Sequence, residues 1–148
     1  MENYIINNKT VAILKKGKKT IIYDVENVRV INKSIIKILE QNCNFYGSSF
    51  RGRQQCCQKT LKIHYKVPII MTNNIILLQL NSLKSEECLF IVLNKVMDYK
   101  FIDKKLLIKC VNNYQFINKI SSHSFEKMII LGTRLENIIK WQKMIKKL

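Results

Sequence analysis

Short runs of β-branched and aliphatic residues, separated by polar turns, fill much of the first two-thirds of the chain and restrict the possible folds most. Runs of this length predict strands, and the Asn, Asp and Gly residues between them predict turns. Two pairs of runs are expected to form hairpins, 4–6 with 10–14 and 106–111 with 114–120. Pro68 favours an edge strand or a strand start for the extended segment around it. The expected strands or extended segments are residues 4–6, 10–14, 20–25, 28–31, 64–71, 75–80, 89–96, 106–111 and 114–120.

A helix is predicted after the first group of strands, and another in the middle of the chain. Ser34 is the expected N-cap of the first helix, whose inward face is made of Ile35, Ile38, Leu39 and Cys43. The central helix is expected within residues 43–62.

The hydrophobic pattern becomes helical again from residue 122 to the end. Ser122 or Ser124 is the expected N-cap. Gly132 is expected to break or bend the helix, so that Thr133 begins the last one. We therefore predict an α+β fold, with antiparallel strands and hairpins in the first two-thirds, a central helix and C-terminal helices. A chain of 148 residues is large enough for one domain spanning residues 1–148.

The chain is strongly basic. It carries 26 basic and 10 acidic residues, which give a formal net charge of +16. Such an excess on one small domain favours a polyanionic partner, and nucleic acid before a membrane surface. Of the basic residues 22 are lysine, and an A+T-rich coding sequence would enrich lysine, isoleucine and asparagine by codon bias alone. Even half of the excess would be large, so nucleic acid stays the expected partner.

Five cysteines, at positions 43, 56, 57, 88 and 110, form no C-x-x-C pair, and free thiols in a reducing cytoplasm are their simplest interpretation. The N-terminus has no signal-peptide pattern, and no apolar run is long enough to span a bilayer. We therefore expect a cytoplasmic protein that does not bind or span a membrane. Because the possible metal ligands lack paired spacing and the carboxylates are scattered, we predict no metal site, no cofactor, no catalytic residues and no enzyme activity.

Residues 43–62 differ from the rest of the chain because they hold two arginines, a Gly-Ser-Ser turn and three of the five cysteines. A helix with Ser48 or Ser49 as its N-cap would have an inward face made of Phe50, Cys57 and Leu61. Its outer face would carry polar and basic side chains without a carboxylate, namely Arg51, Gln55, Gln58, Lys59 and Lys62.

This outer face favours contact with a nucleic acid, because its side chains can donate to phosphates and base edges. The N–H groups of Gly47, Ser48 and Ser49 would suit a phosphate at the helix start. Arg53 would lie on the flank of the apolar face, where it either reaches a DNA groove or pairs with a buried carboxylate and holds the helix. If the segment were extended instead, Arg51 and Arg53 would project to the same side. A solvated helix face without a partner is an equal alternative on residue types alone.

The block Cys-Asn-Phe-Tyr-Gly-Ser-Ser-Phe-Arg-Gly-Arg at residues 43–53, followed by Ile63-His64 and by residues 67–71, resembles the ComK family of competence transcription factors of low-GC Gram-positive bacteria. The resemblance extends to Tyr4 with residues 10–14 and to the Ser-His-Ser-Phe-Glu run that begins at Ser122. It implies a transcriptional activator of competence (DNA-uptake) genes that binds double-stranded A+T-rich promoter boxes, largely through the minor groove, as paired dimers. It also implies control by adaptor-mediated Clp proteolysis.

Minor-groove binding suits these residue types. The narrow groove of A+T-rich DNA concentrates negative potential and attracts Arg and Lys, and Asn and Gln can bond to its base acceptors. Two other functions stay open. One is a basic RNA-binding or nucleoid-associated protein without promoter specificity, and the other is a membrane-surface protein that binds through its last helix. The expected DNA-binding residues are Ser48, Ser49, Arg51, Arg53, Gln55, Gln58, Lys59 and Lys62.

Overall fold

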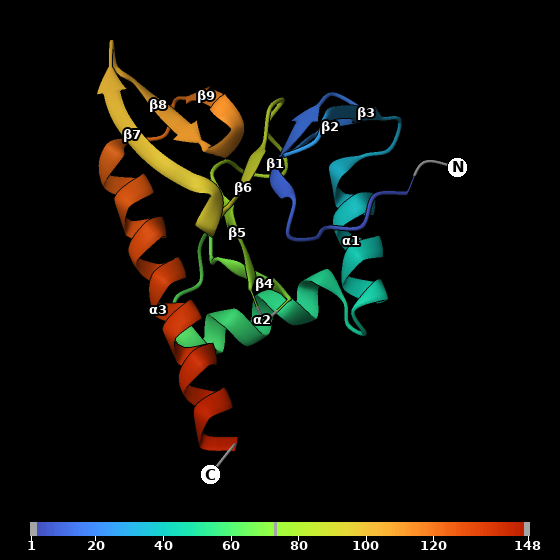
Figure 1. Cartoon of the computed structure of the whole chain (residues 1–148), viewed down its shortest axis with the longest axis vertical. Helices are drawn as coiled ribbons and strands as arrows, with labels where there is room; N and C mark the ends of the chain where they lie inside the picture. The colour runs from blue at the N-terminus through green and yellow to red at the C-terminus, as the bar shows by residue number, and fades with distance from the viewer. Residues whose placement is uncertain (1–2, 73, 147–148) are drawn as a thin grey trace.

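The computed structural model describes residues 3–72 and 74–146, and it confirms the predicted α+β class (Figure 1). Its strands form two antiparallel sheets, one in the order β3-β2-β1-β6-β5-β4 and one in the order β7-β8-β9. The larger sheet contains β1 (Thr10–Lys16), β2 (Lys19–Asp24), β3 (Val28–Ile31), β4 (Ile69–Thr72), β5 (Ile75–Gln79) and β6 (Leu89–Val92). The smaller sheet contains β7 (Val96–Ile102), β8 (Lys105–Cys110) and β9 (Gln115–Asn118). The helices of the described part are α1 (Ile35–Phe45), α2 (Phe50–Leu61), α3 (Ser122–Lys146) and the short 3-10 helices η1 (Leu93–Lys95) and η2 (Val111–Asn113).

Most of the expected strands are confirmed. The runs at 10–14, 20–25 and 28–31 are β1, β2 and β3, and the hairpin at 106–120 is β8 and β9. Every residue of β5 and β6 is buried, as expected for the runs at 75–80 and 89–96, although β6 ends at Val92.

Strand β7 was not among the expected ones. A bulge shifts its register between Val96 and Asp98, so the only residues of β7 that are partly buried, Val96 and Tyr99, stand three positions apart. A strand is recognised in a sequence by apolar residues at every second position, and the three-residue spacing lacks this alternation.

The predicted hairpin between residues 4–6 and 10–14 is wrong, because residues 4–6 form no strand. A side chain of α1 bonds to their backbone instead. The Asn42 amide accepts from the Ile6 N–H at 2.7 Å and donates to the Tyr4 carbonyl at 2.9 Å. Asn42 is 1% exposed, so both of these bonds lie out of water. Helix α1 therefore takes the place that a partner strand would have had.

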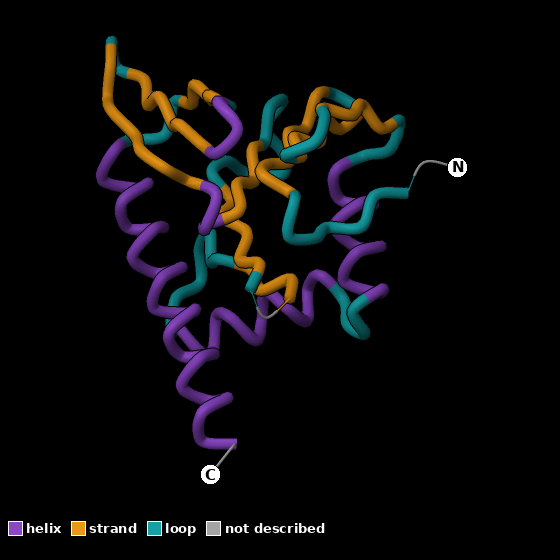
Figure 2. The backbone as a smooth tube through the Cα atoms, viewed as in Figure 1, coloured by secondary structure: helices purple, strands orange, loops and turns teal. Residues whose placement is uncertain are grey.

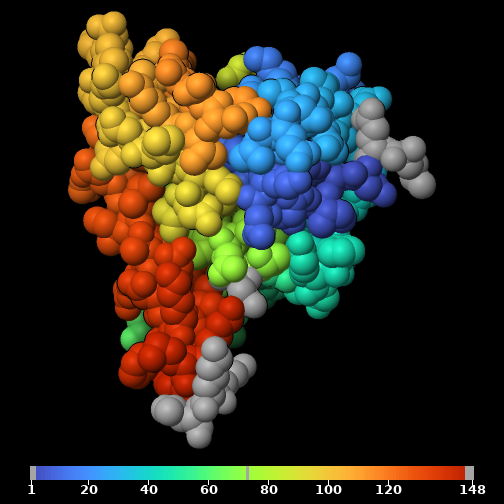
Figure 3. Space-filling model, viewed as in Figure 1, coloured from blue at the N-terminus to red at the C-terminus, as the bar shows by residue number. Residues whose placement is uncertain are grey.

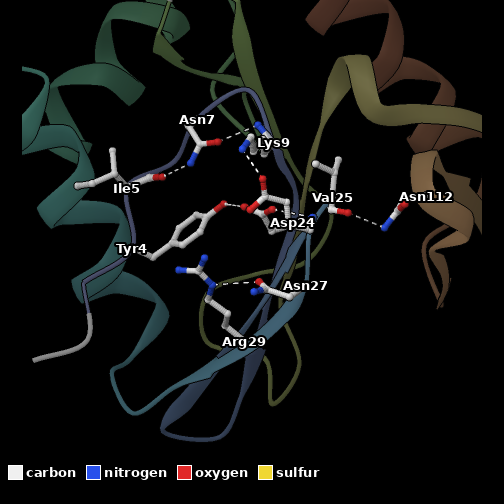
Figure 4. Close-up of polar contacts among 10 residues, drawn as sticks. Tyr4, Ile5, Asn7, Lys9, Asp24, Val25, Asn27, Arg29 and Asn112 are labelled. Atoms are coloured by element: carbon white, nitrogen blue, oxygen red, sulfur yellow. Dashed lines mark hydrogen bonds and ion pairs between the residues drawn. The ribbon is translucent and has the colours of Figure 1, made fainter.

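Tyr4 also anchors the N-terminal segment to β2 (Figure 4). Its hydroxyl donates to Oδ2 of the buried Asp24 at 2.7 Å. Burial favours the neutral phenol and raises the pKa of Tyr4. On the other side of Asp24, the Tyr114 hydroxyl donates to its carbonyl oxygen at 2.6 Å, and Asn112 Nδ2 donates to the Val25 carbonyl at 2.9 Å. These bonds join the two sheets at the end of β2.

The extended segment predicted at 64–71 is wrong in its first part, because residues 64–68 form a loop and β4 begins at Ile69. Lys66 has a φ of 49°, and this left-handed backbone interrupts an extended run. Its Nζ donates to the Leu80 carbonyl at 3.0 Å, which holds the loop beside the end of β5. β4 is an edge strand, as Pro68 predicted.

The predicted break at Gly132 is wrong, because α3 is one helix of 25 residues and Thr133 lies inside it (Figure 2). A Cβ atom on Gly132 would lie 3.1 Å from Leu78 Cδ2 and 3.2 Å from Leu93 Cδ2. Glycine is thus what allows α3 to approach β5 and η1. This close packing outweighs the cost of glycine inside a helix, about 1 kcal/mol relative to alanine.

The helix starts agree with the sequence in one case and differ in another. Ser34 is the N-cap of α1, and the predicted inward residues of that helix are buried. For α3 the expected caps, Ser122 and Ser124, are wrong. The capping oxygen is that of Ser121, whose Oγ accepts from the Ser124 N–H at 3.1 Å. Among the described residues, no helix is long and apolar enough to cross a membrane.

Candidate nucleic-acid interface

Helix α2 is the central helix that the sequence predicts, and it lies between β4 and α3 (Figure 1). Gly47, with a φ of 88°, reverses the chain after α1. Ser49 is then the N-cap, since its Oγ accepts from the Gly52 N–H at 2.9 Å. The predicted inward face is confirmed, because its three members are buried: Phe50, Cys57 and Leu61.

Several N–H donors at the start of α2 are already bonded within the chain, including two of the three predicted to hold a phosphate. The N–H groups of Gly47 and Ser48 donate to carbonyl oxygens of α1 at 3.0 and 2.9 Å. The Phe50 N–H donates to the Glu40 carboxylate at 3.3 Å, and a negative charge at a helix start is favourable. The geometry therefore gives no support to a phosphate at this position. Ser49 caps α2, and the Ser48 hydroxyl accepts a hydrogen bond from Arg53, so both side chains support the fold. Their contact with DNA stays a prediction.

Arg53 lies on the inner flank of α2 and makes four hydrogen bonds to the chain itself. Its Nε donates to Ser48 Oγ at 2.6 Å, and its Nη2 donates to the Tyr46 carbonyl at 3.3 Å. Its Nη1 donates to two carbonyls of β4, those of Ile70 at 2.6 Å and Met71 at 2.8 Å. Of the two roles that we considered for Arg53, the structure favours holding the helix. The partners are three carbonyl oxygens and the Ser48 hydroxyl instead of the expected carboxylate.

Four of the five remaining predicted residues form the outer row of α2, which we define as Arg51, Gln55 and Lys59 of the helix and its C-cap Lys62. All four side chains are exposed. Gln58 lies beside this row but is partly buried, and its Nε2 donates to the His64 carbonyl at 3.1 Å. A shallow depression of about 450 Å³ runs along this part of the surface, lined by Gln55, Gln58, Lys59, Lys62 and His64.

The charges of the outer row are not neutralised by ion pairs. The three ion pairs found in the described part of the chain are Lys9–Glu26, Lys16–Glu87 and Lys140–Glu136, and none of them involves α2. Residues 43–62 contain no Asp or Glu. The outer row is therefore an exposed cationic strip with amide donors, which suits a polyanion.

The cysteines near this strip are mainly core residues. Of the five free cysteines only Cys56 is exposed. Burial raises the pKa of the Cys43 thiol to about 11 and that of Cys57 above its ordinary value. Among the described residues, no group of three or more His, Cys, Asp or Glu is placed to hold a metal ion.

The outer row and its arginine anchor belong to a segment that is matched by a known family. The model of the ComK protein family matches residues 1–143. The chain belongs to the ComK family. It is also 29% identical, over 138 residues, to a protein of Bacillus subtilis (strain 168) named "Competence transcription factor"; the match covers 87% of this chain and 71% of that protein. No solved structure matches the chain.

Two contributors to the candidate site were missed in the sequence. Glu40 is ten positions before Phe50, and an acidic residue just ahead of a basic segment was the only signal for its role at the helix start. The carbonyls of Ile70 and Met71 gave no signal, because every residue has a carbonyl and only the folded chain brings these two to Arg53.

Proposed function

We propose that the protein is a DNA-binding transcriptional activator of competence genes that recognises A+T-rich promoter boxes, largely through the minor groove, with the whole chain acting as one domain. The observation that carries the proposal is the outer row of α2, an exposed set of donors without a carboxylate. The net charge of +16 and membership of the ComK family support it.

The size of α2 constrains how it meets the groove. The minor groove is about 6 Å wide, and a helix with its side chains is about 10–12 Å across. The helix axis therefore stays outside the groove, and the long side chains of Arg51 and Lys59 reach in or bind the flanking phosphates. Gln55 stands between them and can bond to base acceptors. Arg53 keeps α2 fixed against β4, so that the row is presented without a large loss of entropy on binding.

The other parts of the proposal follow from the family. The protein works in the cytoplasm, binds double-stranded DNA as a homo-oligomer, and is removed by Clp proteolysis through an adaptor protein. It needs neither a cofactor nor catalysis for this role.

A mobility-shift experiment tests the proposal. We compare an A+T-box duplex, a scrambled duplex of equal length and an RNA at one salt concentration. Tighter binding to the A+T-box duplex supports a promoter-specific protein. Equal affinity for all three would overturn it and favour a nonspecific RNA-binding or nucleoid-associated protein.

A pair of charge-matched variants tests the site. Arg51→Ala with Lys59→Ala removes two positive charges from the outer row, whereas Lys37→Ala with Lys84→Ala removes two from exposed positions elsewhere. The first variant is expected to bind the A+T-box duplex much more weakly, and the second to keep most of the wild-type affinity. Equal losses would mean that net charge, and not the outer row, determines binding.

A further inference from the structure

The turn between β7 and β8 is a second surface with the chemistry of a DNA contact. It forms a corner of the molecule (upper left in Figures 1 and 3), near the start of α3 and away from the segment of α3 that lies beside α2. Phe101 and Ile102, the last two residues of β7, are 53% and 46% exposed. Because the two residues are adjacent in the sequence, the tip of the hairpin carries an exposed apolar pair.

The two apolar side chains point to opposite faces of the hairpin. Phe101 is paired with Leu106, and Ile102 with Lys105, so the two successive residues lie on alternate faces. A flat partner would cover only one of them. A narrow slot, such as the space between two base pairs opened from the minor groove, would cover both.

The turn itself keeps the tip narrow. Asp103 and Lys104 are its two residues, and their φ values are 49° and 64°. Positive φ at both central residues is typical of the tight type I′ hairpin, whose twist matches that of the strands. Tyr99, two residues before Phe101, packs edge-on against Phe125 of α3 with ring centroids 5.1 Å apart. The base of the hairpin thus packs against α3, whereas its tip is exposed to solvent.

Charges around the tip favour a polyanion. Lys100, Lys104 and Lys105 are exposed, and the single acidic residue among them is Asp103. Lys100 and Lys105 lie on the same face as Ile102, because Lys100 is two positions before it and Lys105 is its partner. An apolar tip flanked by lysines can place its apolar atoms between bases while the ammonium groups bind the phosphates on either side.

We infer that the β7–β8 hairpin inserts Phe101 and Ile102 as a wedge at a base step of the DNA, and so unstacks and kinks the duplex that α2 binds. This inference rests on the proposed function, since it needs a DNA-binding protein. Flexible steps such as TA, which are frequent in A+T-rich boxes, unstack at the lowest cost. The wedge would thus add to the preference for such boxes without any hydrogen bond to a base.

The test uses the full chain and an A+T-box duplex that carries 2-aminopurine at its centre and a donor–acceptor dye pair at its ends. With the wild-type protein, we expect binding to raise the 2-aminopurine fluorescence and to shorten the end-to-end distance. Phe101→Ala with Ile102→Ala is expected to lose most of both changes and to weaken binding about tenfold. Met97→Ala removes another exposed apolar side chain of β7 far from the tip and is expected to behave as the wild type.

The outcomes separate the two proposals. If the wild-type protein binds no DNA, the proposed function fails. If it binds but leaves the fluorescence unchanged, or if the double variant unstacks DNA as the wild type does, the wedge is overturned and the proposed function stands. A double variant that keeps its DNA effects but loses self-association in sedimentation velocity would show that the tip is a protein contact, which also overturns the wedge. Ile102→Ala alone, on the outer face, provides the same test if the loss of Phe101 unfolds the hairpin.

Discussion

Nη1 of Arg53 donates a hydrogen bond of 2.6 Å to the carbonyl oxygen of Ile70, 17 residues further along the chain. This bond joins α2 to the edge strand β4, and the same nitrogen also bonds to the next carbonyl, that of Met71. Two arginines only two positions apart therefore have different surroundings, because Arg51 is exposed on the outer row and Arg53 is bonded inside the fold. Their substitutions should have different effects.

Arg53→Ala is expected to lower the free energy of unfolding by about 2–3 kcal/mol, because hydrogen bonds from a charged donor are lost and carbonyls of β4 lose their partner. Arg51→Ala should change it by no more than about 0.5 kcal/mol, as is usual for an exposed side chain. Urea denaturation of the two variants measures the difference. Equal stabilities would contradict the role of Arg53 as an anchor.

The salt dependence of DNA binding should report the outer row directly. Each phosphate contact contributes about −0.9 to the slope of log K against log salt concentration. Arg51→Ala with Lys59→Ala should therefore make the slope less steep by about 1.8, measured by fluorescence anisotropy over a salt series. The variant Lys37→Ala with Lys84→Ala should leave the slope nearly unchanged. A similar change in both variants would indicate a diffuse charge effect.

Gly132→Leu should destabilise the protein by about 1–3 kcal/mol, because the new side chain would overlap the region now filled by Leu78 and Leu93. Thr133→Leu is the matched control, since Thr133 is the next residue of α3 and is exposed. We expect it to stay within about 0.5 kcal/mol of the wild type. Thermal or urea unfolding measures both. If Gly132→Leu were as stable as the control, the close approach of α3 to β5 would be disproved.

Alkaline pH should destabilise the fold through its buried thiols. Burial raises the pKa of Cys88 from 9.0 to about 11 and that of Cys110 from 9.0 to about 12. As the pH rises above about 9, the unfolded chain releases these protons before the folded chain does, so the stability present below that pH is lost progressively up to about pH 12.

Urea denaturation at about pH 8 and about pH 10.5 measures this loss. Cys110→Ala should reduce the pH dependence, because one of the shifted thiols is gone. Cys56→Ala, at the exposed cysteine, should leave it as in the wild type. The same pH dependence in Cys110→Ala and the wild type would show that other groups cause it.

Features set by neighbours in sequence were predictable. The inward face of α2, the N-cap at Ser34 and the β8–β9 hairpin depend on periodicity, capping oxygens and turn residues within a few positions, and the structure confirms all three. The same local patterns defined the outer row of α2 as a carboxylate-free strip, and its exposure agrees with that expectation.

The errors come from contacts between distant parts of the chain. Residues 4–6 have a strand-like sequence, but the Asn42 side chain forms hydrogen bonds with their backbone N–H and carbonyl groups. No residue near position 4 indicates this contact. Gly132 is a helix breaker by propensity and a packing site in the fold. The residues alone determined the α+β class, the basic character and the donor strip of α2, because these follow from composition and local spacing. Only the tertiary structure decided that Arg53 anchors α2 while Arg51 faces solvent, because that depends on which carbonyls the folded chain brings within hydrogen-bonding distance.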